Sequence, residues 1–239
     1  MYGWRAKIGL LVPAQNLTME EEFHRMAPDG VSIHTSRMFY RKLELSIETL
    51  TEIGAGSEDA ARRVAMAGPD IIVFGCTTGS LIKGVGYDQE LTERIEGATN
   101  IPAVTTSTAV LDAFKTLDLK RVAVASPYTT EVNEKVKEFL EGNGYSVTEI
   151  KGLEHFDITL IGKEPVTTSY RLAKEVDTPD ADAVFISCTD FRTIEVLEKL
   201  ERDLGKPIVS SNQASMWAAL RKVGIKEHLE GYGSLLHQA

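Results

Sequence analysis

The two halves of this 239-residue chain repeat three sequence blocks in the same order, and this repeat constrains the fold more than any single motif does. The first block is an apolar run that ends at a proline, the second is an apolar run that ends in Cys-Thr, and the third follows a proline and ends in hydroxyl or amide side chains. The matched pairs are residues 8–13 with 121–127, 69–77 with 181–189, and 101–107 with 206–212. We interpret the repeat as an internal duplication, which predicts two like lobes packed about a pseudo-twofold axis.

Short β-branched runs alternate with longer amphipathic stretches along the chain, a pattern typical of βα units and a largely parallel sheet. The predicted strands are residues 7–12, 31–37, 70–75, 103–106, 121–125, 146–150, 183–187 and 208–210. The predicted helices are residues 17–26, 47–67, 88–96, 107–117, 130–142, 166–175, 192–204 and 213–223. The pattern predicts an α/β fold of two similar Rossmann-like lobes, each with a parallel four-stranded sheet, and an active site between them. We place the lobes at residues 1–117 and 118–239, and we allow for chain ends that cross between them.

Charge and composition exclude several classes of function. The formal charge is -9 and the isoelectric point is near 5.2, and no cluster of Lys and Arg offers a site for nucleic acid or an anionic membrane. No apolar run approaches the roughly 20 residues that cross a bilayer, and the first residues show no signal-peptide pattern, so we expect a cytoplasmic protein. The glycines do not have the spacing of a nucleotide-binding loop and the histidines do not have metal-ligand spacing, so we expect neither a cofactor nor a metal.

The chain has only two cysteines, Cys76 and Cys188, and each follows an apolar strand and precedes a threonine. That position is the carboxyl end of a parallel strand, where ligands bind in open α/β sheets. A free cysteine is usually a small buried apolar residue. Two cysteines at equivalent positions of a repeat favour a catalytic pair on opposite sides of one cleft. Asp190 is predicted to cap the helix after Cys188. The dipole of such a helix start would favour the Cys188 thiolate, and the neighbouring Asp190 carboxylate would work against it.

Polar residues at the same strand ends can hold a carboxylate, because the charge that builds on its oxygens needs fixed donors. The candidates are Thr77, Thr78, Thr189, Tyr128 and Asn16. Their ordinary interpretations are turn residues for the threonines, a packing aromatic for Tyr128 and a helix cap for Asn16. The acidic run at residues 20–22 is typical of the first turn of a helix.

Nearly the whole chain resembles the aspartate/glutamate racemase superfamily, and within it the branch of maleate cis-trans isomerases and arylmalonate decarboxylases. The resemblance rests on residues 2–5, Val12 and Pro13 with Asn16, Met19 and Glu20, residues 75–80, 126–128, 187–189, 191–193 and 211–214. It implies a Cys76 thiolate that adds to the double bond of a cis-enedioate and a Cys188 thiol that protonates the adjacent carbon. It also implies a shell of Asn16, Thr77, Thr78, Tyr128 and Thr189 around the substrate carboxylates, with Pro13 shaping the cleft.

The chain departs from the isomerase pattern at several positions. Maleate isomerases read Asp-Asn-Leu-Glu-Ile-Gly where this chain has Asp-Ile-Thr-Leu-Ile-Gly at residues 157–162, so Ile158 replaces an asparagine that would contact a carboxylate. Asp190 stands where an Asn is usual, and Gln15 where a Ser is usual. The apolar residue at 158 predicts a substrate with one carboxylate and a less polar second arm.

These observations predict a cofactor-independent isomerase, either a cis-trans isomerase or a racemase, of a small mono- or dicarboxylic acid. One alternative is an arylmalonate-type decarboxylase that uses Cys188 alone as proton donor, since such enzymes have glycine where Cys76 stands. A second alternative is a non-catalytic protein that binds a carboxylate or senses thiol oxidation. A homo-oligomer, a dimer or larger, is the common expectation for such a fold.

Overall fold

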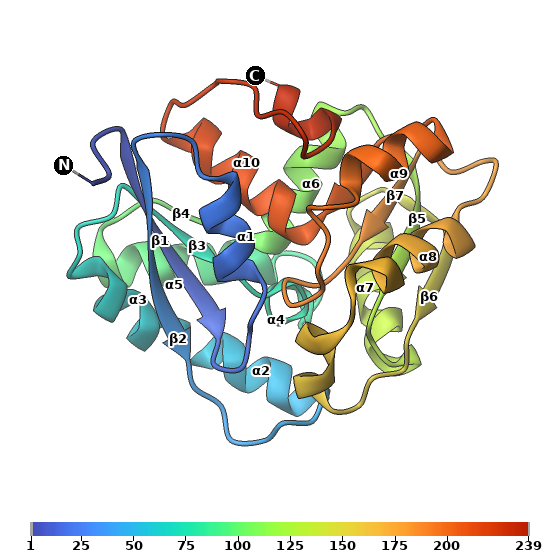
Figure 1. Ribbon diagram of the computed structural model, residues 1–239. Coiled ribbons are helices and arrows are strands. Elements are labelled where there is room, and N and C mark those ends of the chain that lie inside the picture. Colours follow the sequence, from blue (N-terminus) through green and yellow to red (C-terminus); the bar gives the residue numbers. More distant parts are fainter. Residues whose placement is uncertain (1, 239) are drawn as a thin grey trace.

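Each half of the chain builds a four-stranded parallel sheet in the computed structural model, which describes residues 2–238 (Figure 1). The strands are β1 (Ala6–Pro13), β2 (Val31–Met38), β3 (Ile71–Phe74), β4 (Ala103–Thr105), β5 (Arg121–Ser126), β6 (Ser146–Gly152), β7 (Ala183–Ile186) and β8 (Ile208–Ser210). Their orders, β2-β1-β3-β4 and β6-β5-β7-β8, are the same topology. The predicted fold class and its duplication are confirmed.

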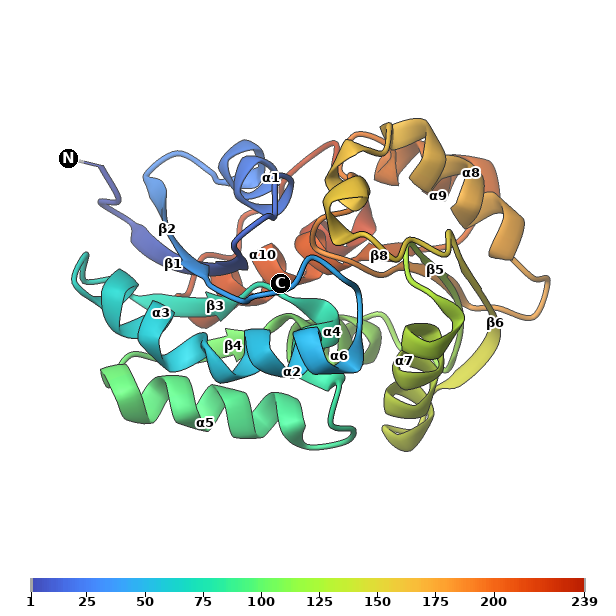
Figure 2. The same cartoon turned by 90° about the horizontal axis from the view of Figure 1, so that it is seen from below.

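Helices cover both faces of each sheet and fill the space between the lobes (Figures 1 and 2). The α-helices are α1 (Met19–Met26), α2 (Ile47–Ala55), α3 (Ser57–Ala65), α4 (Thr77–Leu81), α5 (Tyr87–Thr99), α6 (Thr106–Thr116), α7 (Thr130–Gly142), α8 (Val166–Val176), α9 (Leu197–Leu204) and α10 (Ser211–Lys222). Two short 3₁₀ helices, η1 (Ile158–Lys163) and η2 (Ser234–His237), complete the set. Strands β3 and β7 are buried along their whole length, as continuous apolar runs require. No helix within residues 2–238 is long and apolar enough to cross a membrane.

The lobes meet along α6 and α10, the equivalent helices that follow the last strand of each sheet. Helix α10 packs on α6 and also reaches β3 and β4 of the first sheet. Small hydroxyl side chains let the helices approach: Ser215 Oγ donates to Thr106 Oγ1 at 3.1 Å, and Thr77 Oγ1 donates to Ser211 Oγ at 2.8 Å. Because α10 packs across the lobes, the division at residue 117 stays a prediction.

Two predicted helices have different limits in the structure. The helix predicted at residues 47–67 is interrupted at Gly56, which separates α2 from α3, because glycine weakens a helix interior. The helix predicted at residues 192–204 begins only at Leu197. In the segment before it, the Thr193 and Ile194 N–H groups donate to the Glu22 carboxylate of the other lobe, at 2.7 and 3.3 Å.

Glu22 lies in the predicted acidic first turn of α1, but it is buried rather than solvated. Its second oxygen accepts from Asn212 Nδ2 at 2.7 Å. Burial is the largest effect on this carboxyl and raises its pKa to about 7, while the donors from Thr193, Asn212 and Ile194 oppose the shift. Glu22 therefore makes polar contacts between the lobes, and the charge of its carboxyl group changes near neutral pH.

The raised pKa of Glu22 predicts a pH dependence of stability that Glu22→Gln removes. The native state holds the Glu22 proton more tightly than the unfolded state does, so protonation of Glu22 stabilises the fold. This stabilisation is fully present below about pH 4.5 and is lost as pH rises through about 7. This shift in the pKa of Glu22 corresponds to about 3 kcal/mol in the free energy of unfolding. Between pH 5 and pH 8.5 the free energy of unfolding of the wild type should fall relative to that of Glu22→Gln, measured by urea denaturation. Glu21→Gln, an exposed neighbour, is the control, and parallel curves for wild type and Glu22→Gln would contradict the prediction.

Candidate active site

A small pocket lies between the carboxyl ends of the two sheets, with a cavity volume of about 30 Å³, room for about two water molecules. Both cysteines line it, although they are 112 residues apart in the chain. The lining residues are Pro13, Gln15, Asn16, Leu45, Thr49, Leu50, Ile53, Cys76, Thr78, Tyr128, Ile158, Ile161, Cys188, Thr189 and Asp190. The structure thus brings together all the residues named from the sequence except Thr77.

Cys76 is the N-cap residue of α4, directly after β3. The Gly79 N–H and the Thr78 hydroxyl are near its sulfur, and both lower the pKa of the thiol. Burial outweighs them and raises the pKa of the thiol to about 11. Desolvation is therefore the dominant effect on the Cys76 thiol.

Cys188 does not stand at a helix start, which corrects the sequence prediction. It has a φ of 139°, a region that non-glycine residues rarely adopt. Its N–H donates to Ser211 Oγ at 3.1 Å, and its sulfur accepts from the Asp190 N–H at 3.4 Å. Burial first, and then the Asp190 carboxylate, raise the pKa of this thiol further above its ordinary value than that of Cys76.

Asp190 is not the cap predicted for the following helix. Its carboxylate accepts from the Leu17 and Thr18 N–H groups at 2.7 and 3.2 Å, and so joins the β1–α1 loop to the end of β7. Burial raises its pKa to about 6 despite these donors. The helix after Cys188 begins too far along the chain for Asp190 to cap it.

The polar shell is held by its own hydrogen bonds. Asn16 Oδ1 accepts from the Thr18 and Met19 N–H groups, and its Nδ2 donates to Thr189 Oγ1 at 3.1 Å. Thr189 Oγ1 in turn donates to the Gly75 carbonyl at 3.1 Å. One Asn16 hydrogen is left for a ligand, and the interpretation of Asn16 as a helix cap also holds.

Tyr128 and Thr77 have different places relative to this shell. Tyr128 is fully buried beside Cys188, and burial raises the pKa of its phenol well above the ordinary value, so it remains an O–H donor. Thr77 turns its hydroxyl to Ser211 Oγ and does not line the pocket. Thr77 therefore contributes to the packing of the lobes.

One wall of the pocket is apolar, and most of it was missed by sequence reasoning. Leu50 and Ile53 come from α2, Leu45 comes from the loop before it, and Ile158 and Ile161 come from η1. Only Ile158 was singled out from the sequence, because the other four resemble ordinary core residues. Their spacing carries no signal for a site, since only tertiary packing sets them against the cysteines.

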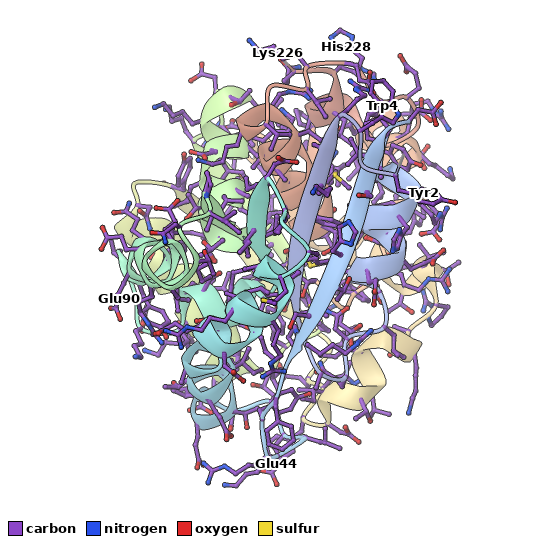
Figure 3. The ribbon with its side chains drawn as sticks, turned by 90° about the vertical axis from the view of Figure 1, so that its left-hand side faces the viewer. Tyr2, Trp4, Glu44, Glu90, Lys226 and His228 are labelled. Carbon is purple, nitrogen blue, oxygen red and sulfur yellow. The ribbon has the colours of Figure 1, made fainter. Side chains whose placement is uncertain are left out.

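Two loops close the pocket from opposite lobes by pairing their backbones. The Leu45 N–H donates to the Phe156 carbonyl at 2.7 Å, and the Ile158 N–H donates to the Leu43 carbonyl at 3.1 Å. Glu44 and Asp157 form the antiparallel bridge between them. Figure 3 places Glu44 at the end of the molecule opposite Lys226 and His228, the end toward which β1 and β2 run in Figure 1.

A comparison with protein families decides the relationship of this chain. The family model described as arylmalonate decarboxylase matches residues 8–236. The chain belongs to the arylmalonate decarboxylase family. This chain is 31% identical to the arylmalonate decarboxylase of Bordetella bronchiseptica, over 76% of this chain and 77% of that enzyme.

Maleate isomerases are similar to this family member over nearly its whole length. A maleate isomerase of Geobacillus stearothermophilus is 26% identical over 96% of both chains. The crystal structure of a mutant maleate cis-trans isomerase of Nocardia farcinica, with a covalently bound succinylcysteine intermediate, is 27% identical and superposes with a TM-score of 0.93 over 98% of this chain and 99% of that one. The predicted family is confirmed.

The pKa shifts predict unequal and pH-dependent thiol reactivity. Only the thiolate is alkylated, so the rate for Cys76 should rise about tenfold per pH unit up to a pKa of about 11. Cys188 should react more slowly than Cys76 throughout, because its pKa is raised further. Iodoacetamide labelling of Cys76→Ser and Cys188→Ser, followed by mass spectrometry, measures each thiol alone. The unfolded protein is the control, and a rate for Cys76 that levels off below pH 9 would contradict the assigned effect of burial.

Proposed function

We propose that this chain is a cofactor-independent cis-trans isomerase of small cis-alkenoic acids that carry at least one carboxylate. The observation that carries the proposal is the pair of buried thiols on one pocket, each at the end of the equivalent strand of a duplicated fold. The similarity to maleate isomerases over nearly the whole chain supports the same conclusion.

The environments of the two sulfurs assign their roles. Cys76 has the Gly79 N–H and the Thr78 hydroxyl as donors and the smaller rise in pKa, so it is the easier thiol to ionise and acts as the nucleophile. Cys188 has the Asp190 carboxylate nearby and holds its proton more firmly, so it acts as the acid. Isolation from water strengthens both effects.

The reaction needs no co-reactant. The Cys76 thiolate forms a C–S bond to one alkene carbon, and the π electron pair moves to the neighbouring carbon and its carbonyl group. The Cys188 thiol gives its proton to that carbon. After rotation about the new single bond, the Cys188 thiolate takes the proton back, the C–S bond breaks, and the trans double bond and the Cys76 thiolate are restored.

The charge that develops on the substrate carbonyl oxygen needs fixed donors within the pocket. Asn16 Nδ2, the Thr78 hydroxyl, the Thr189 N–H and the Tyr128 O–H are the groups we assign to this task. Pro13 shapes the cleft beside them. The network that fixes Asn16 on Thr189 keeps these donors in place before the substrate binds.

The pocket favours a substrate with one carboxylate and a less polar second arm. Ile158 and four other aliphatic side chains form one wall, and among residues 2–238 the only lining side chain with a charged form other than the cysteines and Tyr128 is Asp190. A second carboxylate against these aliphatic side chains would lose its hydration without gaining a cation. An ester or amide arm keeps the electron-withdrawing carbonyl that the addition step needs.

Decarboxylation is the second candidate, and the 31% identity to an arylmalonate decarboxylase favours it. That reaction needs Cys188 as a proton donor and makes no use of Cys76.

One experiment separates the two candidates. The protein is incubated in deuterium oxide with maleate, monomethyl maleate, maleamate, phenylmalonate or a chiral 2-arylpropionate, and each reaction is followed by proton NMR. We expect trans product from the cis-alkenoic acids, whereas carbon dioxide release from phenylmalonate alone would replace our proposal with the second candidate.

Both cysteines should be required for isomerisation. Replacing Cys188 with Ala removes the acid and should lower kcat by about 10²–10⁴, and Cys76→Ala should lower it at least as much because no covalent adduct forms. The measurement is the rate of trans product formation with monomethyl maleate. Retention of activity by Cys76→Ala would refute the proposed role of this thiol.

Restoring a polar group at residue 158 should change substrate preference. Ile158→Asn places an amide on the apolar wall, so the ratio of kcat/KM for maleate to that for monomethyl maleate should rise about tenfold, the effect of one hydrogen bond to a charged group. Ile158→Val keeps the wall apolar and is the matched control. An unchanged ratio in Ile158→Asn would show that this wall does not contact the second arm.

A further inference from the structure

A continuous chain of hydrogen bonds joins the buried Glu22 carboxylate to the sulfur of Cys188. The first link is Asn212, the second residue of α10, which is almost fully buried. Its Nδ2 donates both to Glu22 Oε2 at 2.7 Å and to the Thr189 carbonyl at 3.0 Å. The two acceptors use both hydrogens of one amide group, and this fixes the orientation of the Asn212 side chain.

The second link is the peptide group between Thr189 and Asp190. Its carbonyl accepts from Asn212, and its N–H donates to Cys188 Sγ at 3.4 Å. The C=O and N–H of a trans peptide point in opposite directions, and residues 2–238 contain no cis peptide. Holding the carbonyl on one side therefore aims the N–H at the sulfur on the other side.

The same helix start also holds the strained residue itself. Ser211 Oγ accepts from the Cys188 N–H at 3.1 Å, so consecutive residues of α10 bind the peptide group before Cys188 and the Thr189–Asp190 peptide that follows it by one residue. A φ of 139° is strained at a cysteine and persists only when its surroundings enforce it. Ser211 holds the peptide group before Cys188, and Asn212 holds the Thr189–Asp190 peptide after it.

Among residues 2–238 no Lys, Arg or His forms an ion pair with Glu22, which makes the Asn212 hydrogen bond important to this carboxylate. The arginines nearby, Arg25 and Arg192, both pair with Glu195, at 2.6 and 3.2 Å. The Glu22 carboxylate is held by the Thr193 and Ile194 N–H groups and by Asn212. A charged acceptor strengthens its hydrogen bonds, so the Glu22 carboxylate binds the Asn212 amide more firmly than a neutral side chain would.

We propose that Glu22 and Asn212 are positioning residues for the Cys188 thiol, which they orient and support through the Thr189–Asp190 peptide without touching the substrate. The assignment of Cys188 as an acid rests on the proposed function, but the hydrogen-bond chain does not. Glu22→Gln disrupts the chain because its amide nitrogen would face the Asn212 nitrogen, donor against donor. Asn212→Ala removes the link entirely.

The test uses the full chain with Cys76→Ser, in which Cys188 is the only thiol. Loss of the Asp190 N–H contact disfavours the Cys188 thiolate, so iodoacetamide labelling at pH 9 should slow about threefold or more in Glu22→Gln and in Asn212→Ala. The double variant should be no slower than Asn212→Ala, because both residues act through one chain. Glu21→Gln removes the same charge from the same helix and should leave the rate unchanged.

Two further measurements separate positioning from a general loss of structure. In a Cys188→Ser background, Glu22→Gln should leave the labelling rate of Cys76 unchanged. In the otherwise native enzyme, Glu22→Gln should lower kcat about tenfold for monomethyl maleate with little change in KM. Should Glu22→Gln fail to fold, Asn212→Ser carries the same test.

The outcomes also distinguish this inference from the proposed function. Labelling of Cys188 that is unchanged or faster in both variants, or an equal slowing at Cys76, would overturn the positioning role. A slower Cys188 in an enzyme that isomerises none of the acids would support the hydrogen-bond chain and reject the proposed reaction.

Discussion

The close packing of α6 against α10 is the constraint on which the rest of the site depends. These helices follow the last strand of each sheet, so their contact sets how the carboxyl ends of the two sheets face each other. Ser211 shows the coupling most directly, because its hydroxyl accepts from Thr77 Oγ1 of one lobe and from the Cys188 N–H of the other. A shift between the lobes would therefore alter the segments that carry both thiols.

Symmetry of the fold does not extend to the chemistry of the two cysteines. Cys76 caps a short helix and has neutral donors around its sulfur, whereas Cys188 lies in a strained loop beside a carboxylate. Both thiols are removed from water, so their proton affinities differ through fixed dipoles and charges rather than through exposure. Duplication supplied two equivalent positions, and local substitutions made one thiol the easier to ionise.

The sequence predicted the parts of the structure that follow from local pattern. Continuous apolar runs located β3 and β7, and the Cys-Thr repeat placed both thiols at strand ends. The contacts that depend on distant residues could not be read in this way. Glu22 looked like one of three solvated glutamates, yet it is buried and accepts from the Thr193 and Ile194 N–H groups of the other lobe. Asp190 resembled a helix cap because nothing in the neighbouring sequence reveals that its carboxylate accepts hydrogen bonds from Leu17 and Thr18. The apolar wall of the pocket likewise could not be predicted, because its side chains come from segments of both lobes that meet only in the folded structure.

The backbone at Cys188 has a consequence for how this position can change over time. Glycine would adopt a φ of 139° without a side-chain penalty, so selection for stability alone would drive the residue toward glycine. A cysteine at this position therefore carries a backbone strain that glycine would relieve. At position 188 the loss of a thiol and the release of backbone strain would come with the same substitution, so the side chain and the backbone make opposite demands on one residue.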